Sequence, residues 1–291
     1  MRKKTNILLL ALIIICAAIF VGYRMLDAIR TDTKAPAITV SGDVPELSVR
    51  DSRDSLLQGV TATDDQDGDV TSSLLVENVT LLDSTGRINV SYAAFDNAGN
   101  VAKIQREARF TDYVSPRFTL SAPLMYRNGT SFDVLSTVGA TDTFDGDIQH
   151  RIRATALGDT VITAMGTHDV RFQVTNSLGD TATIVIPVEV YDPLNYTASL
   201  TLKHYLVYLK AGDSFQPSTY LDCFTLSGKE TKLSSSLPYG YSLQTIGEVD
   251  TETPGVYSLQ YLVTYTEKSE ISTLSDRKYT GYSKLIVVVE G

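Results

Sequence analysis

The chain has no tryptophan and only two cysteines, Cys16 and Cys223. Cys16 lies inside an apolar run that we interpret below as a membrane helix, so a disulfide between the two residues is excluded. The fold is therefore expected to hold without disulfides, which is typical of bacterial rather than animal surface modules of this size. We predict that Cys223 is a small buried apolar residue.

Clusters of basic residues are also missing. The net charge of −9 is spread as +4 over residues 1–35, −7 over 36–112, −4 over 113–192 and −2 over 193–291. Binding to phosphate backbones needs clustered Lys and Arg, so nucleic acid is excluded as a partner.

Catalytic motifs are absent as well. The sequence contains no HExxH pair, no G-x-S-x-G elbow and no phosphate-binding glycine loop. Its three histidines, His150, His168 and His204, occur singly, and His168 occupies a strand position where a packed side chain is expected. We therefore predict that the protein is not an enzyme.

One seven-residue pattern, Gly-x-φ-x-φ-x-aromatic with φ mostly apolar, occurs three times: GRINVSY at 86–92, GTHDVRF at 166–172 and GVYSLQY at 255–261. Starts 80 and 89 residues apart indicate one supersecondary unit repeated three times. Alternating apolar residues and abundant Val, Ile, Thr and Tyr favour strands over helices. In the first copy the alternation places Val90, Tyr92 and Ala94 on the buried face.

The first two repeats also match elsewhere. PAITVS at 36–41 aligns with PRFTLS at 116–121, ATDDQDGDV at 62–70 with ATDTFDGDI at 140–148, and VSYAAFDNAGNVA at 90–102 with VRFQVTNSLGDTA at 170–182. Pro before the first strand suits a strand start, and Asn and Gly suit the hairpin turn at 96–100.

These motifs resemble the bacterial surface immunoglobulin-like repeats, and are similar to HYR-type repeats and to the Ig-like module of some pesticidal crystal proteins. The resemblance covers 35–192 well and is weaker over 193–291. It implies an all-β protein with three tandem immunoglobulin-like β-sandwiches, at 35–113, 114–192 and 193–291, behind one N-terminal transmembrane helix.

That helix is predicted at 7–23, between a short cytoplasmic start at 1–6 and a linker at 24–34. Seventeen uncharged residues follow Arg2, Lys3 and Lys4 and span roughly 25 Å, near the lower limit for a bilayer. The basic flank predicts a single-pass protein of the cell membrane, with its N-terminus in the cytoplasm and its bulk outside. A cleaved signal peptide and lipidation of Cys16 are the alternatives.

Acidic residues gather in the turn that the first two repeats share. Asp64, Asp65, Asp67 and Asp69 in the first correspond to Asp142, Asp145 and Asp147 in the second. Crowded carboxylates are suited to a hard cation such as calcium. The alternative is that these side chains cap the local backbone of a glycine turn. The sequence leaves both interpretations open.

The expected function is non-enzymatic: a membrane-anchored surface protein that presents a binding surface for adhesion or protein–protein interaction. The alternatives are a structural spacer or scaffold subunit of an envelope assembly, and a carbohydrate-binding accessory protein. An unknown envelope protein or a surface glycan would be the partner. The third repeat holds eleven of the sixteen tyrosines, most of them expected in strand packing and some available for an exposed aromatic face.

Overall fold

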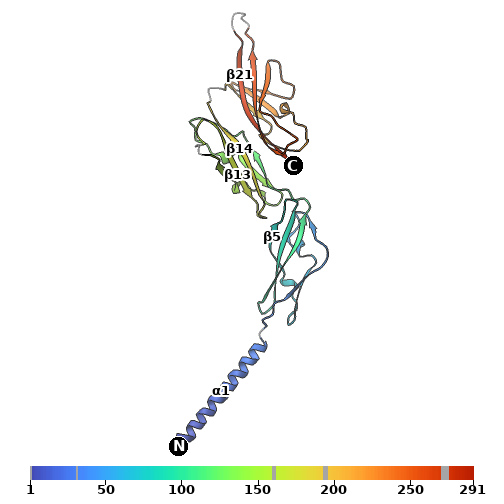
Figure 1. Ribbon diagram of the computed structural model, residues 1–291, viewed down its shortest axis with the longest axis vertical. Helices are drawn as coiled ribbons and strands as arrows, with labels where there is room; N and C mark the ends of the chain where they lie inside the picture. The colour runs from blue at the N-terminus through green and yellow to red at the C-terminus, as the bar shows by residue number, and fades with distance from the viewer. Residues whose placement is uncertain (1, 31, 159–161, 193–195, 270–274) are drawn as a thin grey trace. The chain divides into compact units, whose positions relative to one another are not determined.

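The computed structural model describes residues 2–30, 32–158, 162–192, 196–269 and 275–291. It forms two compact units, Met1–Tyr113 and Val114–Gly291 (Figure 1). The predicted boundary at residue 193 lies outside the described residues. Each unit is built mainly of strands, in agreement with the predicted all-β class.

The first unit begins with a helix, α1 (Arg2–Arg30). Leucine, alanine and isoleucine dominate it and proline is absent, which favours a continuous helix. The helix also includes residues 24–30, which we had placed in a linker.

The predicted membrane topology is wrong. Within the described part of the chain, no helix is both long enough and apolar enough to cross a membrane. With seventeen residues, the apolar run at 7–23 lies at the bottom of the range that crosses a bilayer, so the prediction had no margin in length. The assignment of the chain to the cell membrane as a single-pass protein is therefore withdrawn.

Two sheets follow α1 in the first unit. One has the order β1-β3-β4 and the other β2-β7-β6-β5. Residues from both sheets, among them Ile38, Ala62 and Ala94, pack against one another, so the unit contains a β-sandwich. Its elements are β1 (Ala37–Val40), β2 (Glu46–Leu47), the 3-10 helix η1 (Arg53–Leu57), β3 (Val60–Asp64), β4 (Gly68–Asp69), η2 (Thr71–Ser73), β5 (Leu75–Leu81), β6 (Arg87–Phe95) and β7 (Val101–Phe110).

The second unit repeats this order of elements in its first half. Its sheets are β11-β10-β8 and β12-β13-β14-β9, and they share one core. The elements are β8 (Arg117–Leu120), β9 (Met125–Arg127), η3 (Val134–Thr137), β10 (Val138–Asp142), β11 (Gly146–Asp147), η4 (Gln149–Arg151), β12 (Arg153–Ala156), β13 (Gly166–Thr175) and β14 (Thr181–Tyr191).

The second half of this unit is one larger sheet, in which the first strand of the repeat also pairs with the last. Its order is β18-β17-β15-β21-β20-β19, with β16 paired to β21. The elements are β15 (Ala198–Leu202), β16 (Leu206–Lys210), η6 (Pro217–Tyr220), β17 (Leu221–Leu226), β18 (Lys229–Lys232), β19 (Tyr241–Ile246), β20 (Gly255–Glu267) and β21 (Arg277–Glu290).

The repeated seven-residue pattern forms the start of β6, β13 and β20, the central strands of their sheets. As predicted, Val90, Tyr92 and Ala94 are fully buried. The buried Tyr92 hydroxyl donates to the Leu56 carbonyl of η1 at 2.7 Å, and Tyr261 donates to the Pro217 carbonyl of η6 at 3.1 Å. Phe172 fills the same position in the second repeat without a hydroxyl. One aromatic therefore anchors the strand in each repeat.

The two halves of the second unit are joined by shared packing. Ile286 of β21 belongs to the core of the second repeat. The Tyr208 hydroxyl accepts a hydrogen bond from the Phe118 N–H at 2.9 Å, and Arg117 pairs with Glu290. These contacts make residues 114–291 one compact body. Three independent domains therefore remain a prediction.

Candidate functional site

The two acidic turns are built alike. Asp64 ends β3, and its Oδ1 accepts hydrogen bonds from the N–H groups of Gln66 and Asp67 at 2.8 and 3.0 Å. Asp142 ends β10 and accepts in the same way from Phe144 and Asp145 at 2.9 and 2.5 Å. In each turn, therefore, the first aspartate caps the backbone of a glycine turn, which was the alternative to a calcium site.

The remaining predicted site residues of the first turn have partners of their own. Asp67 accepts from the N–H and the side-chain amide of Asn97 at 2.8 and 2.7 Å, while Asp69 accepts from the Thr71 N–H at 2.9 Å. Asp65 forms an exposed ion pair with Lys34 at 2.9 Å. These three carboxylates do not converge on one point with Asp64.

An arginine pairs with one carboxylate of the second turn. Asp145 accepts from the N–H and hydroxyl of Ser177 at 2.7 and 2.6 Å, and from Arg151 at 2.7 Å. Burial opposes ionisation of Asp145, but the Ser177 donors and Arg151 outweigh it and lower the pKa of this carboxyl. Asp147 accepts from the Gln149 N–H at 2.9 Å. Every predicted acidic residue of this turn thus has at least one donor.

Hydrogen bonds also govern ionisation in the first turn. The backbone N–H groups of Asp67 and Gln66 hold the pKa of Asp64 below its ordinary value of 3.8. The Thr71 hydroxyl and N–H lower the pKa of Asp69 in the same way. Both carboxyls are therefore ionised at neutral pH.

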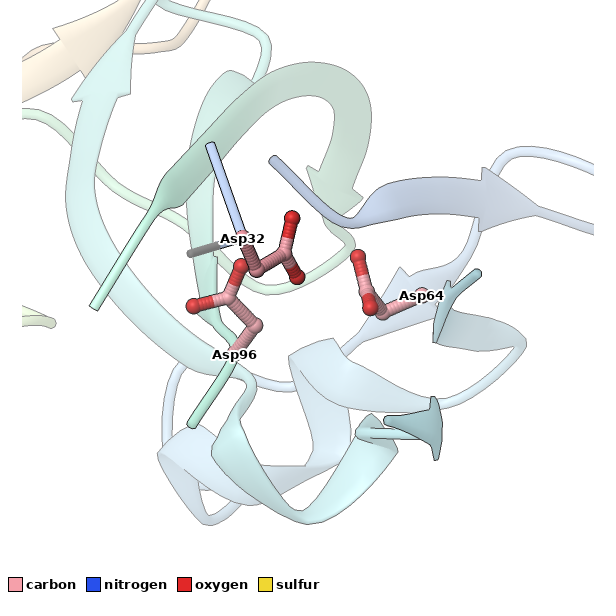
Figure 2. A group of neighbouring side chains, drawn as sticks. All are labelled: Asp32, Asp64 and Asp96. Atoms are coloured by element: carbon pink, nitrogen blue, oxygen red, sulfur yellow. The ribbon is translucent and has the colours of Figure 1, made fainter. Parts of the chain in front are cut away.

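A different acidic cluster forms at the end of the first sandwich. It consists of Asp32, Asp64 and Asp96, with one carboxylate oxygen of each within 4.8 Å of the other two (Figure 2). Of these three residues, the calcium site predicted from the sequence included only Asp64, because Asp32 precedes the first strand and Asp96 was assigned to a hairpin turn. Pairing of β1 with β3 could have indicated the cluster, since it sets the start of one strand beside the end of the other.

The second unit contains an aromatic groove of about 160 Å³. The Tyr196 ring stacks on Tyr282 with ring centres 4.8 Å apart and meets the Tyr191 ring edge-on at 5.4 Å. Arg127 of β9 also lines the groove. We call the surface formed by Arg127, Tyr191, Tyr196 and Tyr282 the tyrosine groove.

A buried polar network supports this groove. The Tyr282 hydroxyl donates to Glu189 at 2.6 Å, and the Lys284 ammonium lies 3.7 Å from the same carboxylate and donates to the Pro187 carbonyl at 3.1 Å. Lys284 is only 3% exposed, and its burial lowers its pKa despite the nearby Glu189. Burial and the hydrogen bond to Glu189 raise the pKa of Tyr282, so its hydroxyl stays a donor.

Other predictions for single residues are confirmed. Cys223 is buried in β17, and His168 is buried in β13 with its Nε2 2.7 Å from the Ala164 carbonyl oxygen. Most tyrosines of the third repeat pack on its core, whereas Tyr239 is 87% exposed.

No family model and no curated protein matches the chain. Solved structures give weak matches. One contains the CBM51-2 domain, in complex with GlcNAc, and the INT domains of Clostridium perfringens ZmpB (TM-score 0.21, 14% identity, 88% of this chain and 42% of that one). Others are the protocadherin GammaB4 extracellular domain (0.20, 11%, 87% and 49%) and mouse cadherin-23 EC22-24 (0.19, 11%, 88% and 99%).

The chain spans less than half the length of the first two of these proteins. TM-scores near 0.2 carry no argument about the function of this chain, and the fold rests on the sheets described above.

Proposed function

We propose that the chain is a non-enzymatic binding protein, which presents a ligand surface on its β-sandwich repeats for adhesion or protein–protein interaction. The observation that carries this proposal is the tyrosine groove. Tyrosine supplies a large, stiff contact area with a polar tip, and arginine supplies several donors in a fixed plane. Residues of both kinds are enriched where proteins bind their partners.

The position of the groove supports the same function. Tyr191 ends β14 and Tyr282 lies in β21, and the Tyr282 hydroxyl is held by Glu189 of β14. A surface on packed strands is presented with little loss of conformational entropy on binding. The groove is smaller than most small-molecule pockets, so it suits one side chain or one sugar ring of a larger ligand.

A carbohydrate-binding role is the second candidate, favoured by the stacked Tyr196 and Tyr282 rings. Aromatic faces pack against the apolar faces of sugars, and Arg127 can donate to hydroxyl or carboxylate oxygens. A spacer or scaffold role is favoured instead by the coupling between the two halves of the second unit.

The test compares the full chain with Tyr196→Ala and Arg127→Ala variants on glycan and peptide arrays. Tyr239→Ala is the matched control, because it removes an exposed tyrosine outside the groove. The binding function is supported when a signal on either array falls at least about tenfold in both groove variants and persists in the control. Loss of a glycan signal selects the carbohydrate role. Equal signals for the groove variants and the wild type would refute the groove as the binding surface.

A further inference from the structure

Three carboxylates from separate segments meet at one end of the first sandwich. Asp64 is the last residue of β3, Asp96 follows β6, and Asp32 precedes β1. Figure 2 shows the three side chains as neighbours. One carboxylate oxygen of each lies within 4.8 Å of the other two. At neutral pH such a group concentrates negative charge, and the mutual repulsion opposes the observed arrangement.

A second observation concerns the hydrogen bonding of these oxygens. Asp64 is 8% exposed, and its Oδ2 is buried without a hydrogen-bond partner. The Oδ2 of Asp32 is likewise buried and unpartnered, while its Oδ1 accepts from the Lys34 N–H at 2.9 Å. A carboxylate oxygen withdrawn from water without a donor is costly, so both atoms point to a missing positive ligand.

The neighbouring cation lies outside the cluster. The Lys34 ammonium acts on Asp64 and Asp32 only through space, since it pairs with Asp65 and its side chain is 70% exposed. Both oxygens of Asp96 accept from Asn100, through the backbone N–H at 2.7 Å and the side-chain amide at 2.8 Å. Asn100 is neutral, so these bonds orient Asp96 without balancing its charge.

We propose that Asp32, Asp64 and Asp96 bind one hard divalent cation, and that calcium is the preferred ion. One carboxylate oxygen of each residue lies within 4.8 Å of the other two, close enough for all three to reach one ion. Calcium accepts six to eight oxygen ligands in flexible geometry, whereas magnesium demands a near-ideal octahedron and is usually held by one or two carboxylates, so three carboxylates from separate segments favour calcium. The three ligands are all oxygens, which disfavours zinc.

The bound ion would fasten the segment between α1 and β1 to the sandwich. The Asn100 side-chain amide already donates to the carbonyl oxygens of Asp32 and Lys34 at 3.2 and 3.3 Å. Coordination by Asp32 adds a charged link from the same segment to the ends of β3 and β6. Calcium therefore controls the order of residues 32–36 in this proposal.

The second repeat provides an internal comparison. Asp142 corresponds to Asp64, and its Oδ2 is also buried and unpartnered. However, Asn176 replaces Asp96. The residue equivalent to Asp32 is Asp112, which accepts from the Ser48 hydroxyl at 2.6 Å and the Val49 N–H at 2.8 Å. With only one free carboxylate oxygen, the second repeat is not expected to bind the ion.

The proposal is tested by titrating the metal-free full chain with calcium chloride in a calorimeter. We expect one ion per chain with a Kd of about 10⁻⁴–10⁻³ M, since three carboxylates supply only part of the six to eight oxygen ligands that calcium takes. Asp32→Asn should weaken binding at least about tenfold, and it leaves the buried Asp64 and Asp96 in place. Asp65→Asn and Asp142→Asn are the matched controls and should bind like the wild type.

Hydrogen exchange tests the site on the wild type itself, and so does not depend on whether a variant folds well. Calcium should slow exchange of residues 32–36 and 95–101 in the wild type, and should not do so in Asp32→Asn. The site is refuted if calcium produces neither heat nor slower exchange up to about 10 mM, or if Asp32→Asn binds as tightly as the wild type. Equal affinity for magnesium would overturn the preference for calcium.

Discussion

The acidic turns of the first and second repeats share their local hydrogen bonds but differ in their surroundings. In both, the first aspartate caps two N–H groups of a glycine turn. In the second repeat Arg151 balances the charge of Asp145, and an asparagine replaces the aspartate that follows the central strand. In the first repeat that aspartate is present and joins two others.

A turn motif therefore determines its own backbone conformation but not whether the turn binds an ion. Ion binding depends on the side chains that tertiary packing brings to the turn. The same lesson applies to the two units as wholes. The first contains a cluster of three carboxylates beside exposed ion pairs such as Lys34 with Asp65, whereas the second contains a buried ion pair, Lys284 with Glu189.

The largest expected difference between the units follows from Tyr92→Ala. This change removes a fully buried aromatic from the first unit and should lower its unfolding free energy by about 4 kcal/mol. Tyr92→Phe keeps the ring, loses the hydrogen bond to Leu56 and should cost about 1 kcal/mol. Hydrogen exchange followed on peptides from each unit measures both changes. Equal destabilisation of the second unit would show that the units do not unfold separately.

Glu189→Gln tests the second unit in the same way. It leaves the Lys284 ammonium buried without a carboxylate, which should cost about 3 kcal/mol. Combining it with Lys284→Met removes the unpaired charge and should restore most of that stability. Urea unfolding of the two variants gives the comparison. A double variant no more stable than Glu189→Gln would argue against the ion pair as the cause.

Acid should affect the first unit more than the second. Hydrogen bonding holds the pKa values of Asp64, Asp69, Asp83 and Asp112 below 3.8 in the first unit. In the larger second unit the described carboxyls with lowered pKa are Asp145 and Asp250. A carboxyl group whose pKa is lowered in the native state stabilises the fold at pH values above its pKa in the unfolded chain. This stabilisation is lost as the pH falls through the native pKa.

We therefore expect exchange protection of the first unit to fall faster than that of the second as the pH is lowered from about 4 to 2. The measurement is exchange on peptides from each unit, corrected for the intrinsic rate at each pH. A steeper loss in the second unit would contradict the assignment of these carboxyls.

The smallest expected difference concerns the glycines of the two turns. Gly68 and Gly146 have φ values of +74° and +73°, and a Cβ at either position meets no atom within 4 Å. Only the left-handed backbone conformation opposes alanine, so each substitution should cost about 1–2 kcal/mol, equally in both units. Unequal costs, measured by thermal unfolding, would show that the turns are less alike than their hydrogen bonds indicate.

Local patterns predicted much of the fold. Alternation correctly placed Val90, Tyr92 and Ala94 inside, and the repeat offsets matched strands that recur in the same order. The coupling of the second and third repeats was not predicted, because Phe118 and Tyr208 lie ninety residues apart and meet only through packing. The membrane helix was wrongly predicted from an apolar run with no margin in length.

The candidate sites were predicted only in part for the same reason. Asp64 was identified from its acidic neighbours, yet those neighbours are engaged elsewhere, Asp65 with Lys34, Asp67 with Asn97 and Asp69 with Thr71. Asp32 and Asp96 are 32 residues away on either side, and no motif links them to Asp64. The tyrosine groove required the register between β15 and β21, which composition cannot supply.

The parallel pairing of an early strand with the last strand of each repeat has a mechanical consequence. Tension applied to the two ends of a parallel pair pulls the strands past one another, so that all of their hydrogen bonds resist together. The paired residues number two for β2 with β7, three for β9 with β14, and five for β16 with β21. Under a pulling force, the first repeat should yield at the lowest load and the third should hold longest.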